Sequence, residues 1–323
     1  MYDVTTVGDI KLDVFIDLGN DAKVHCGINK EDCVMEIKYG EKIPVDTADT
    51  MMAGTAPNVA IGIRRLGGAS SIVSVVGEDA TATLAMEGLK KEGISTDYVT
   101  IAKGTKSSFS AVLNFEGEST VLAVHEPHTF TMPPNIKTEW LFVSELGPDY
   151  KDLYKEITKM AENGMKVAIN PGTIQLEKLD KTLYELIKIA DLLILNKDEA
   201  QSLCNCPTDD PGALVRTMQQ LGPKIAIVTN GRDGSYASDD SKIFHAPLFD
   251  IGDRVEATGA GDAFSTGVLG ALIMGHDLQT ALTWGSVNSG SVVKFIGPQK
   301  GLLTKQQMLD EIANQPGYQV TTI

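Results

Sequence analysis

The sequence of 323 residues is poor in cysteine, aromatic and basic residues, and it contains no long apolar run. Aromatic residues make up only 6% of the chain. No stretch approaches the roughly 18 consecutive apolar residues by which a membrane-spanning helix is recognised. Residues 1–4 lack the basic start and apolar core of a signal peptide, so we expect a cytoplasmic protein that does not contact membranes.

The four cysteines are too few and too irregularly spaced to suggest a metal site. Cys26 and Cys33 form a C-x6-C pair, and Cys204 and Cys206 form a C-x-C pair. Zinc sites typically use C-x2-C pairs, which are absent. We therefore expect free thiols in a reducing cytosol.

Basic residues are outnumbered, with 28 Lys and Arg against 43 Asp and Glu, and the formal net charge is −15. Nucleic acids and anionic membranes bind cationic surfaces, so the charge balance argues against both as partners. An anionic small molecule remains compatible with this charge, provided that local backbone dipoles hold it.

Short apolar runs alternate with amphipathic stretches over most of the chain. The runs lie at 3–8, 72–76, 141–144, 166–170, 192–196 and 224–229. Helical spacing of apolar residues falls at 57–66, 81–92, 149–162, 180–189, 198–204 and 211–221. Nearly continuous apolar runs suit parallel strands buried on both faces. The pattern predicts an α/β fold with a doubly wound, mostly parallel sheet, helices on both faces and ligands at the carboxyl ends of the strands.

Two segments, 14–50 and 107–126, differ from this pattern because apolar and polar residues alternate in them. Alternation predicts strands with one solvated face, typical of antiparallel sheets. Residues 116–118 separate two such stretches and are predicted to form a hairpin turn. We expect the two segments to form a small antiparallel β layer, separate from an α/β core made of residues 1–13, 51–106 and 127–323.

The strongest chemical signal is a glycine-rich turn that leads directly into an apolar helix over 262–274. Gly259 and Gly261 allow the backbone to turn tightly and to approach a ligand. The free N–H groups of the first helical turn and the helix dipole then form an anion hole without Lys or Arg. Asp262 lies at the same helix end, where it either caps the helix or accepts the proton of an attacking hydroxyl.

Other nucleotide-binding motifs fit poorly. The sequence has no G-x4-G-K-[ST] segment, which argues against a P-loop protein. The pair Gly259 and Gly261 is followed by Phe264 where a dinucleotide fingerprint has its third glycine, and it lies near the end of the chain rather than after the first strand. Hydride chemistry is therefore disfavoured.

Residues 259–264, with the sequence GAGDAF, resemble the signature of the ribokinase-like (pfkB) carbohydrate kinases. Three further segments resemble family motifs in the expected order: 53–79, with Ala53 in place of the usual first glycine; 196–199; and 228–234. The resemblance covers nearly the whole chain. It implies a ribokinase-like fold with a β lid, and ATP-dependent, Mg²⁺-assisted phosphorylation of a sugar hydroxyl.

The resemblance also implies roles around the glycine-rich turn. Asp262 would be the general base, and the amides of Gly259, Ala260 and Gly261 would hold the charge of the transferred phosphoryl group. Asn196 and Glu199 would order Mg²⁺ through water beside the ATP phosphates, although the N-x-x-E pattern also fits a reciprocal helix cap. Residues expected to contact the nucleotide are Asn196, Thr229, Gly231, Gly234 and Asn288; a late-helix Asn288 also fits a capping role.

On the sugar side, the resemblance assigns substrate binding to Asp13, Gly54, Asn58 and Glu145. A carboxylate accepts two hydroxyl hydrogen bonds, which suits a polyol. His125 and His128 are further candidates, with an ordinary surface position as the alternative. The family's lid closes over the sugar and excludes water, and in many members it pairs with a second subunit's lid, so a homodimer is expected.

Several residues depart from the family pattern. Lys11 stands where ribokinases have a sugar-binding Asn, which argues against ribose itself. Glu256-Ala257 replaces the usual Asp-Thr, so activation by K⁺ is left open. Thr55 replaces a Lys common among kinases of phosphorylated sugars, which favours an unphosphorylated acceptor. A nucleoside kinase and a non-catalytic sensor remain alternatives; low aromatic content disfavours the first, and the presence of Asp262 disfavours the second.

Overall fold

The computed structural model describes residues 1–19, 22–26, 33–115, 118–239 and 241–323. Its central sheet has ten strands in the order β16-β15-β14-β13-β12-β11-β10-β1-β6-β7. The strands are β1 (Tyr2–Val7), β6 (Ser70–Gly77), β7 (Val99–Ala102), β10 (Thr138–Val143), β11 (Lys166–Ile169), β12 (Leu192–Asn196), β13 (Ile225–Thr229), β14 (Ser235–Ser238), β15 (Ile243–Ala246) and β16 (Thr321–Thr322). Pairing is parallel from β7 to β13 and antiparallel from β13 to β16, which confirms the predicted mostly parallel sheet.

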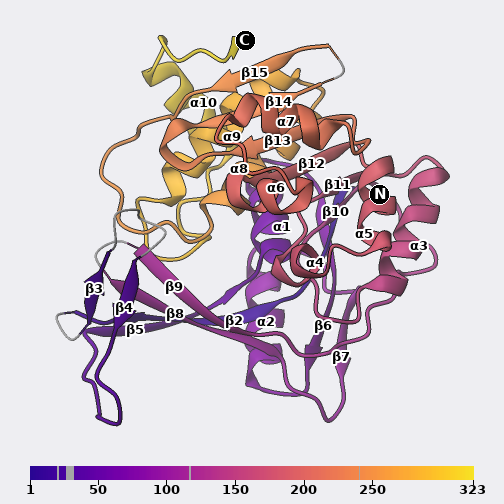
Figure 1. The fold of residues 1–323 in the computed structure, drawn as a ribbon. Helices are drawn as coiled ribbons and strands as arrows, with labels where there is room; N and C mark the ends of the chain where they lie inside the picture. The colour runs from indigo at the N-terminus through magenta and orange to yellow at the C-terminus, as the bar shows by residue number, and fades with distance from the viewer. Residues whose placement is uncertain (20–21, 27–32, 116–117, 240) are drawn as a thin grey trace.

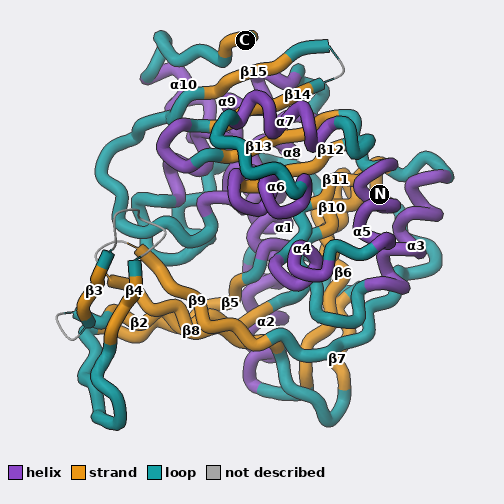
Figure 2. Tube along the Cα trace, viewed as in Figure 1, coloured by secondary structure: helices purple, strands orange, loops and turns teal. Residues whose placement is uncertain are grey.

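Helices cover both faces of this sheet (Figures 1 and 2). One face carries α1 (Thr55–Arg65), α8 (Ala260–Ile273), α9 (Leu278–Val292) and α10 (Lys305–Asn314). The other carries α3 (Lys151–Glu162), α5 (Lys181–Ile189), α6 (Lys197–Cys204) and α7 (Pro211–Gln219). The described residues also form α2 (Ala80–Lys91) and α4 (Thr173–Lys178). Within the described ranges, no helix is long and apolar enough to cross a bilayer.

The buried strands supply side chains to both faces, as their continuous apolar sequences predict. In β10, Trp140 and Phe142 pack against the α1 and α8 side, whereas Leu141 and Val143 pack against the α3 and α5 side. Successive residues of a strand point to opposite faces of the sheet. When helices cover both faces, both sets of residues are apolar, and the sequence shows no alternation of polar and apolar residues.

A second sheet of four strands extends away from the core (Figure 1). Its order is β5-β2-β8-β9, from β2 (Lys11–Asp17), β5 (Thr47–Ala53), β8 (Ser108–Phe115) and β9 (Glu118–Val124). The sheet is antiparallel as predicted, except that β2 and β8 run parallel. Part of the core lies between them in the chain, so no hairpin connects them. Residues 116 and 117 of the predicted turn lie outside the described residues.

The β layer expected from residues 14–50 and 107–126 together is not one sheet. A separate two-stranded hairpin is formed by β3 (Lys23–His25) and β4 (Val34–Glu36). The alternating run that begins at Val34 is a strand only as far as Glu36, and it does not join the four-stranded sheet. Alternation identified an exposed strand here but gave no information about its partner.

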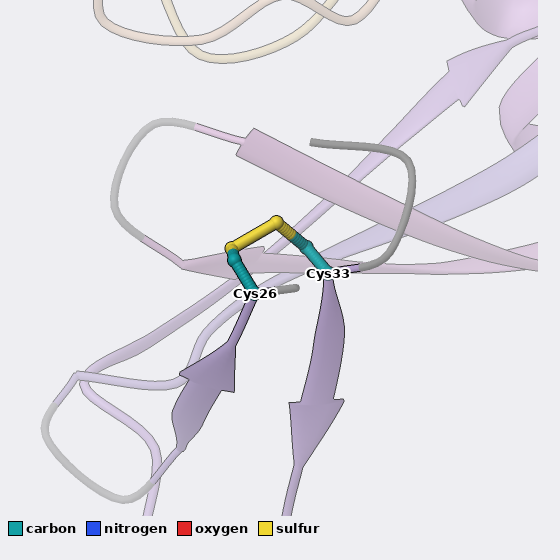
Figure 3. The surroundings of a disulfide bond; sticks show 2 residues. All are labelled: Cys26 and Cys33. Carbon is teal, nitrogen blue, oxygen red and sulfur yellow. A yellow bond between two sulfur atoms is a disulfide. The ribbon is translucent and has the colours of Figure 1, made fainter. Parts of the chain in front are cut away.

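Two of the four cysteines form a disulfide, Cys26–Cys33, so the prediction of free thiols is wrong for this pair (Figure 3). The register of the β3–β4 hairpin explains the pairing. Since His25 pairs with Val34, the two cysteines follow and precede paired residues, and their Cα atoms lie 3.9 Å apart. Cys204 and Cys206 carry free thiols as expected.

Candidate active site

A cavity of about 220 Å³ lies where the carboxyl ends of β12 and β13 meet the N-terminus of α8. Doubly wound sheets bind their ligands at the carboxyl ends of their strands, which is where this cavity lies. Predicted site residues that line the cavity are Glu145, Asn196, Glu199, Thr229, Gly261 and Asp262. The fold therefore brings together residues from four of the sequence segments singled out above.

The glycine-rich turn has the backbone that an anion hole requires. Gly259 caps α8 in the left-handed region with φ 80°. Within the described residues, the amides of Gly259 and Gly261 have no hydrogen-bond partner. The Ala260 amide differs from the prediction because it donates to the Ala257 carbonyl at 3.1 Å. The unpaired amides, with the positive end of the helix dipole, make this corner attractive to an anion.

Asp262 lies in the first turn of α8 and borders the cavity. The Asn58 side-chain amide donates to its Oδ2 at 2.7 Å, and the Thr55 hydroxyl also bonds to the carboxylate. Burial raises the pKa of Asp262, and these two hydrogen bonds oppose that rise. Asn58, predicted to bind the sugar, is 2% exposed and contacts Asp262 instead.

Asn196 and Glu199 form the reciprocal helix cap that was the alternative to metal binding. The Asn196 side chain accepts from the Glu199 amide, and the Glu199 carboxylate accepts from the Asn196 amide, each at 2.9 Å. Both residues also line the cavity. Burial raises the pKa of Glu199. The cap uses one carboxylate oxygen of Glu199, so the two interpretations are compatible.

A second cavity of about 120 Å³ continues from the first, with Thr229 and Gly261 bordering both. Gly231 and Gly234, which were predicted to contact the nucleotide, line this second cavity. Gly234 is also needed by the fold, since its φ is 85° and a Cβ there would lie 2.1 Å from the Ala246 carbonyl oxygen. Lining residues that the sequence reasoning missed are Leu248, Phe249, Phe264, Ser286 and Ser289.

Asn288 does not line this cavity, although its sequence neighbours Ser286 and Ser289 do. It is completely buried, and its amide donates to the Ala263 carbonyl at 2.8 Å while its Oδ1 accepts from the Leu303 amide at 3.0 Å. Both ends of the side chain are thus used inside the protein, and the predicted direct contact with adenine does not agree with this geometry. The α9 residues that border the cavity are Ser286 and Ser289.

Asp13 lies on β2, close enough to Asp262 and Glu145 for their charges to act on its carboxyl group. It is 8% exposed, and its Oδ1 atom has no hydrogen-bond partner in the described part of the chain. Burial raises its pKa to about 6, opposed by a hydrogen bond from Ser110 and by the charge of Lys11. An unpaired carboxylate oxygen in a buried position is well suited to accept a substrate hydroxyl.

A charged network that sequence reasoning missed connects the sugar-side residues. Glu145 Oε2 forms an ion pair with the Lys11 ammonium group. The other carboxylate oxygen, Glu145 Oε1, lies 3.1 Å from His125 Nε2. His125 Nδ1 lies 3.2 Å from Asp9 Oδ2. These two hydrogen bonds raise the pKa of His125 to about 9. Burial opposes ionisation of Glu145, but His125 and Lys11 outweigh it and lower its pKa to about 2.

Two other predicted sugar contacts lie elsewhere. Gly54 is the N-cap of α1 and has φ 115°. A Cβ there would lie 2.5 Å from the Asp9 carbonyl oxygen, so the protein's own backbone, and not a ligand, lies against this glycine. His128 is 4% exposed and bonds to the Thr105 hydroxyl through Nε2 at 3.3 Å. Neither residue lines either cavity described above.

Glu256 connects the four-stranded sheet to the glycine-rich turn. Its Oε1 accepts from the Ser119 hydroxyl of β9 at 2.9 Å and from the Thr258 amide at 2.5 Å. Its Oε2 accepts from the Gly297 amide at 3.1 Å. Three donors thus satisfy a carboxylate that is 2% exposed, and it has no cationic partner among the residues that the structure describes.

Comparison with known proteins identifies the family. A model described as pfkB family carbohydrate kinase matches residues 21–305. The chain is a pfkB carbohydrate kinase. It is 25% identical to the nucleoside kinase of Methanocaldococcus jannaschii, over 84% of this chain and 88% of the relative, and 25% identical to the ribokinase of Bacillus subtilis, over 84% and 91%.

Solved structures agree on the fold. The Arabidopsis thaliana ribokinase, solved with ribose and ATP, superposes with a TM-score of 0.78 at 19% identity, covering 96% of this chain and 98% of that one. This pfkB kinase thus has the ribokinase fold and belongs with sugar and nucleoside kinases, which are phosphotransferases acting on hydroxyl groups. Kinases of this family use ATP, generally with Mg²⁺.

His125 makes the stability of this pfkB kinase dependent on pH. Its folded-state pKa of about 9 exceeds the ordinary value of 6.5, so its contribution is complete below pH 6.5 and lost as the pH rises through about 9. At about 1.4 kcal/mol per pKa unit, that contribution is at most about 3 kcal/mol. We expect the stability advantage of wild type over His125→Gln, from urea unfolding, to shrink across this interval; an advantage independent of pH would contradict the assignment.

Proposed function

We propose that the chain transfers the γ-phosphoryl group of ATP to a hydroxyl of an uncharged sugar or nucleoside. The observation that carries the proposal is the juxtaposition of Asp262 with the unpaired amides of Gly259 and Gly261 at the N-terminus of α8. A proton acceptor thus borders the same cavity as a site for a developing negative charge, which is the arrangement that phosphoryl transfer requires.

In the proposed reaction, Asp262 accepts the proton of the acceptor hydroxyl as its oxygen bonds to the γ-phosphorus. The bond from that phosphorus to the bridging oxygen of ADP breaks in line with the attack. The amides of Gly259 and Gly261 donate to the phosphoryl oxygens as charge develops on them. Because the Ala260 amide already donates to Ala257, we assign the anion hole to the other two amides.

The residues around the cavity suit Mg²⁺ bound mainly through water. Its carboxylates belong to Glu145, Glu199 and Asp262, which are hard oxygen donors. In the described ranges, no three His, Cys, Asp or Glu side chains are arranged to hold a metal by themselves. Glu199, with Asn196, would orient water ligands of the ion, and bound Mg²⁺ would neutralise charge on the triphosphate.

The charges on the sugar side favour an uncharged acceptor. The cations Lys11 and His125 are each paired with a carboxylate, from Glu145 and Asp9. Asp262 adds a further acidic group to the site, so a phosphate or carboxylate on the acceptor would face surplus negative charge. The unpaired oxygen of Asp13 is positioned for a hydroxyl instead.

An ADP-release screen tests this function. The purified protein would be assayed with Mg²⁺ and ATP against free sugars, their phosphates and nucleosides, each with and without K⁺. We expect acceptor-dependent ADP release with at least one uncharged sugar or nucleoside, and little with the phosphates. A preference for phosphorylated acceptors would contradict the assignment, and NAD-dependent absorbance change without ADP release would indicate a dehydrogenase.

We further propose that the four-stranded sheet is a lid that pairs with the lid of a second copy. Its inner face carries Asp13 and buried Val112. Its outer face holds Glu118 and Thr120 of β9 and Thr50 of β5, and otherwise mainly apolar residues. The apolar residues include Leu12, Val14, Ile16, Phe109, Ala111, Leu113, Leu122 and Val124. Leu122 and Val124 are 57% and 52% exposed, and so large an apolar face is typical of an interface.

Light scattering after size exclusion measures this pairing. We expect wild type at twice the chain mass of 34.6 kDa. Leu122→Lys places a charge on the apolar face and is expected to give monomers. Leu309→Lys, at an exposed position of α10, is the matched control and should remain dimeric. A monomeric wild type would contradict the pairing.

A further inference from the structure

A chain of amide hydrogen bonds leads from the main chain of β5 to Asp262. Gln299 Nε2 donates to the Met52 carbonyl oxygen at 2.8 Å and to Asn58 Oδ1 at 2.9 Å. Asn58 Nδ2 then donates to Asp262 Oδ2 at 2.7 Å. The four residues come from β5, α1, α8 and the segment after α9, so the chain joins parts of the fold that are distant in sequence.

The chemistry of the groups sets the direction of this chain. A main-chain carbonyl only accepts, so the Met52 oxygen requires the NH₂ end of Gln299. The same NH₂ group then requires the oxygen of the Asn58 amide. Asn58 is left with its NH₂ group toward Asp262, and at 2% exposure it has almost no water with which to bond in another orientation.

We propose that Gln299 is a positioning residue, which holds the Asn58 amide so that its NH₂ group donates to Asp262. The proposal rests on the assignment of Asp262 as the base. With Asn58 held this way, the carboxylate form of Asp262 is stabilised and remains able to accept a proton. Were the amide reversed, its oxygen would face the carboxylate, and the ionised form would be destabilised.

Gln299 is itself held by neighbours that connect it to the anion hole. The Arg65 guanidinium donates to the Gln299 carbonyl oxygen at 2.5 Å and forms an ion pair with Glu92 at 2.7 Å. The adjacent Pro298 packs against Gly259, where an added Cβ would lie 2.3 Å from the proline Cβ. One short segment therefore supports both the base and the turn that presents the amides.

Other charged groups also act on Asp262. Glu145, Asp13 and Glu199 oppose its ionisation, and Lys11 favours it. These groups are left intact by substitutions at Gln299, so a shift in the pH dependence of activity upon such a substitution reports on the amide chain and on any charge introduced with it.

The test compares the acid limb of kcat/KM against pH in Gln299→Glu and Gln299→Met. A Glu side chain offers no N–H, so Asn58 is expected to turn its NH₂ group toward it and its oxygen toward Asp262. We expect the acid limb of Gln299→Glu to rise by at least one pH unit, with a loss of about 10-fold or more in kcat/KM at pH 7. Gln299→Met, which removes the bonds without reversing them, should shift less.

Lys300→Glu is the control for charge, because it introduces an acid one residue further along at an exposed position and makes the net charge two units more negative, against one unit in Gln299→Glu. Its acid limb should remain within a few tenths of a unit of wild type. Equal shifts in Gln299→Glu and Lys300→Glu, or a wild-type profile in Gln299→Glu, would overturn the positioning role. If Gln299→Glu does not fold, a Gln299→Met profile identical to wild type overturns it.

The failure of this inference is distinguishable from failure of the proposed function. An inactive wild type, or an active Asp262→Asn variant, would reject Asp262 as the base and with it the function described above. An active wild type with an inactive Asp262→Asn variant and an unchanged Gln299→Glu profile would reject only the role of Gln299.

Discussion

Asp262→Asn is expected to lower kcat by about 10³-fold, within the 10²–10⁴-fold range that a general base contributes. The variant keeps the size and shape of the side chain, and its Oδ1 can still accept from Asn58. Burial already disfavours the ionised form of Asp262, so removing the charge should not destabilise the fold. ADP release at saturating substrate measures the effect.

The matched control for this variant is Asp198→Asn. Asp198 is an exposed acid in the first turn of α6 and does not line the cavity. It should retain wild-type kcat, whereas Asp262→Asn should retain the wild-type melting temperature and ATP affinity but not turnover. A kcat for Asp262→Asn within tenfold of wild type would reject the role as base.

Gly261→Val is expected to lower kcat/KM for ATP by at least 10²-fold, the loss associated with one donor of an oxyanion hole. Gly261 borders both cavities, and among the described residues no atom outside its chain neighbours and the adjacent α8 backbone lies within 4 Å of the position its Cβ would take. The valine side chain therefore projects into the space proposed for the phosphates without meeting the protein. Activity should fall while the melting temperature remains near that of wild type.

Gly259→Val, two residues earlier, should fail for the opposite reason. Gly259 has φ 80°, and its Cβ would lie 2.3 Å from that of Pro298. The expected result is a clear loss of thermal stability together with activity. If Gly261→Val were as unstable as Gly259→Val, its loss of activity would carry no information about the anion hole.

The parts of the fold that could be predicted from the sequence are those in which local pattern and burial coincide. Strands such as β10 are apolar throughout because helices cover both their faces. The glycine-rich turn was identified because the left-handed backbone of Gly259 needs glycine and an apolar helix follows it. Both signals depend on neighbours in sequence.

The parts that could not be predicted depend on contacts between distant segments. Gln299 lies 241 residues from Asn58, and His125 lies 114 residues from Lys11, and nothing in the local sequence marks either pair. The Cys26–Cys33 disulfide depends on the register of two three-residue strands, which are too short to give a periodic signal.

Asn288 shows the limit of inference from residue type. Its polar side chain on a late helix suggested contact with a ligand, yet its hydrogen bonds join α8, through Ala263, to Leu303 inside the protein. A buried amide whose hydrogen bonds are all made within the protein and an amide that binds a ligand look the same in the sequence. Only the count of its partners separates the two roles.

A crystal structure of the protein with Mg²⁺, a non-hydrolysable ATP analogue and the preferred acceptor tests the central claim most directly. We predict that oxygens of the terminal phosphate lie within hydrogen-bond distance of the Gly259 and Gly261 amides, with the reacting hydroxyl on Asp262. A terminal phosphate bound away from the N-terminus of α8, or an acceptor hydroxyl that does not contact Asp262, would contradict the account.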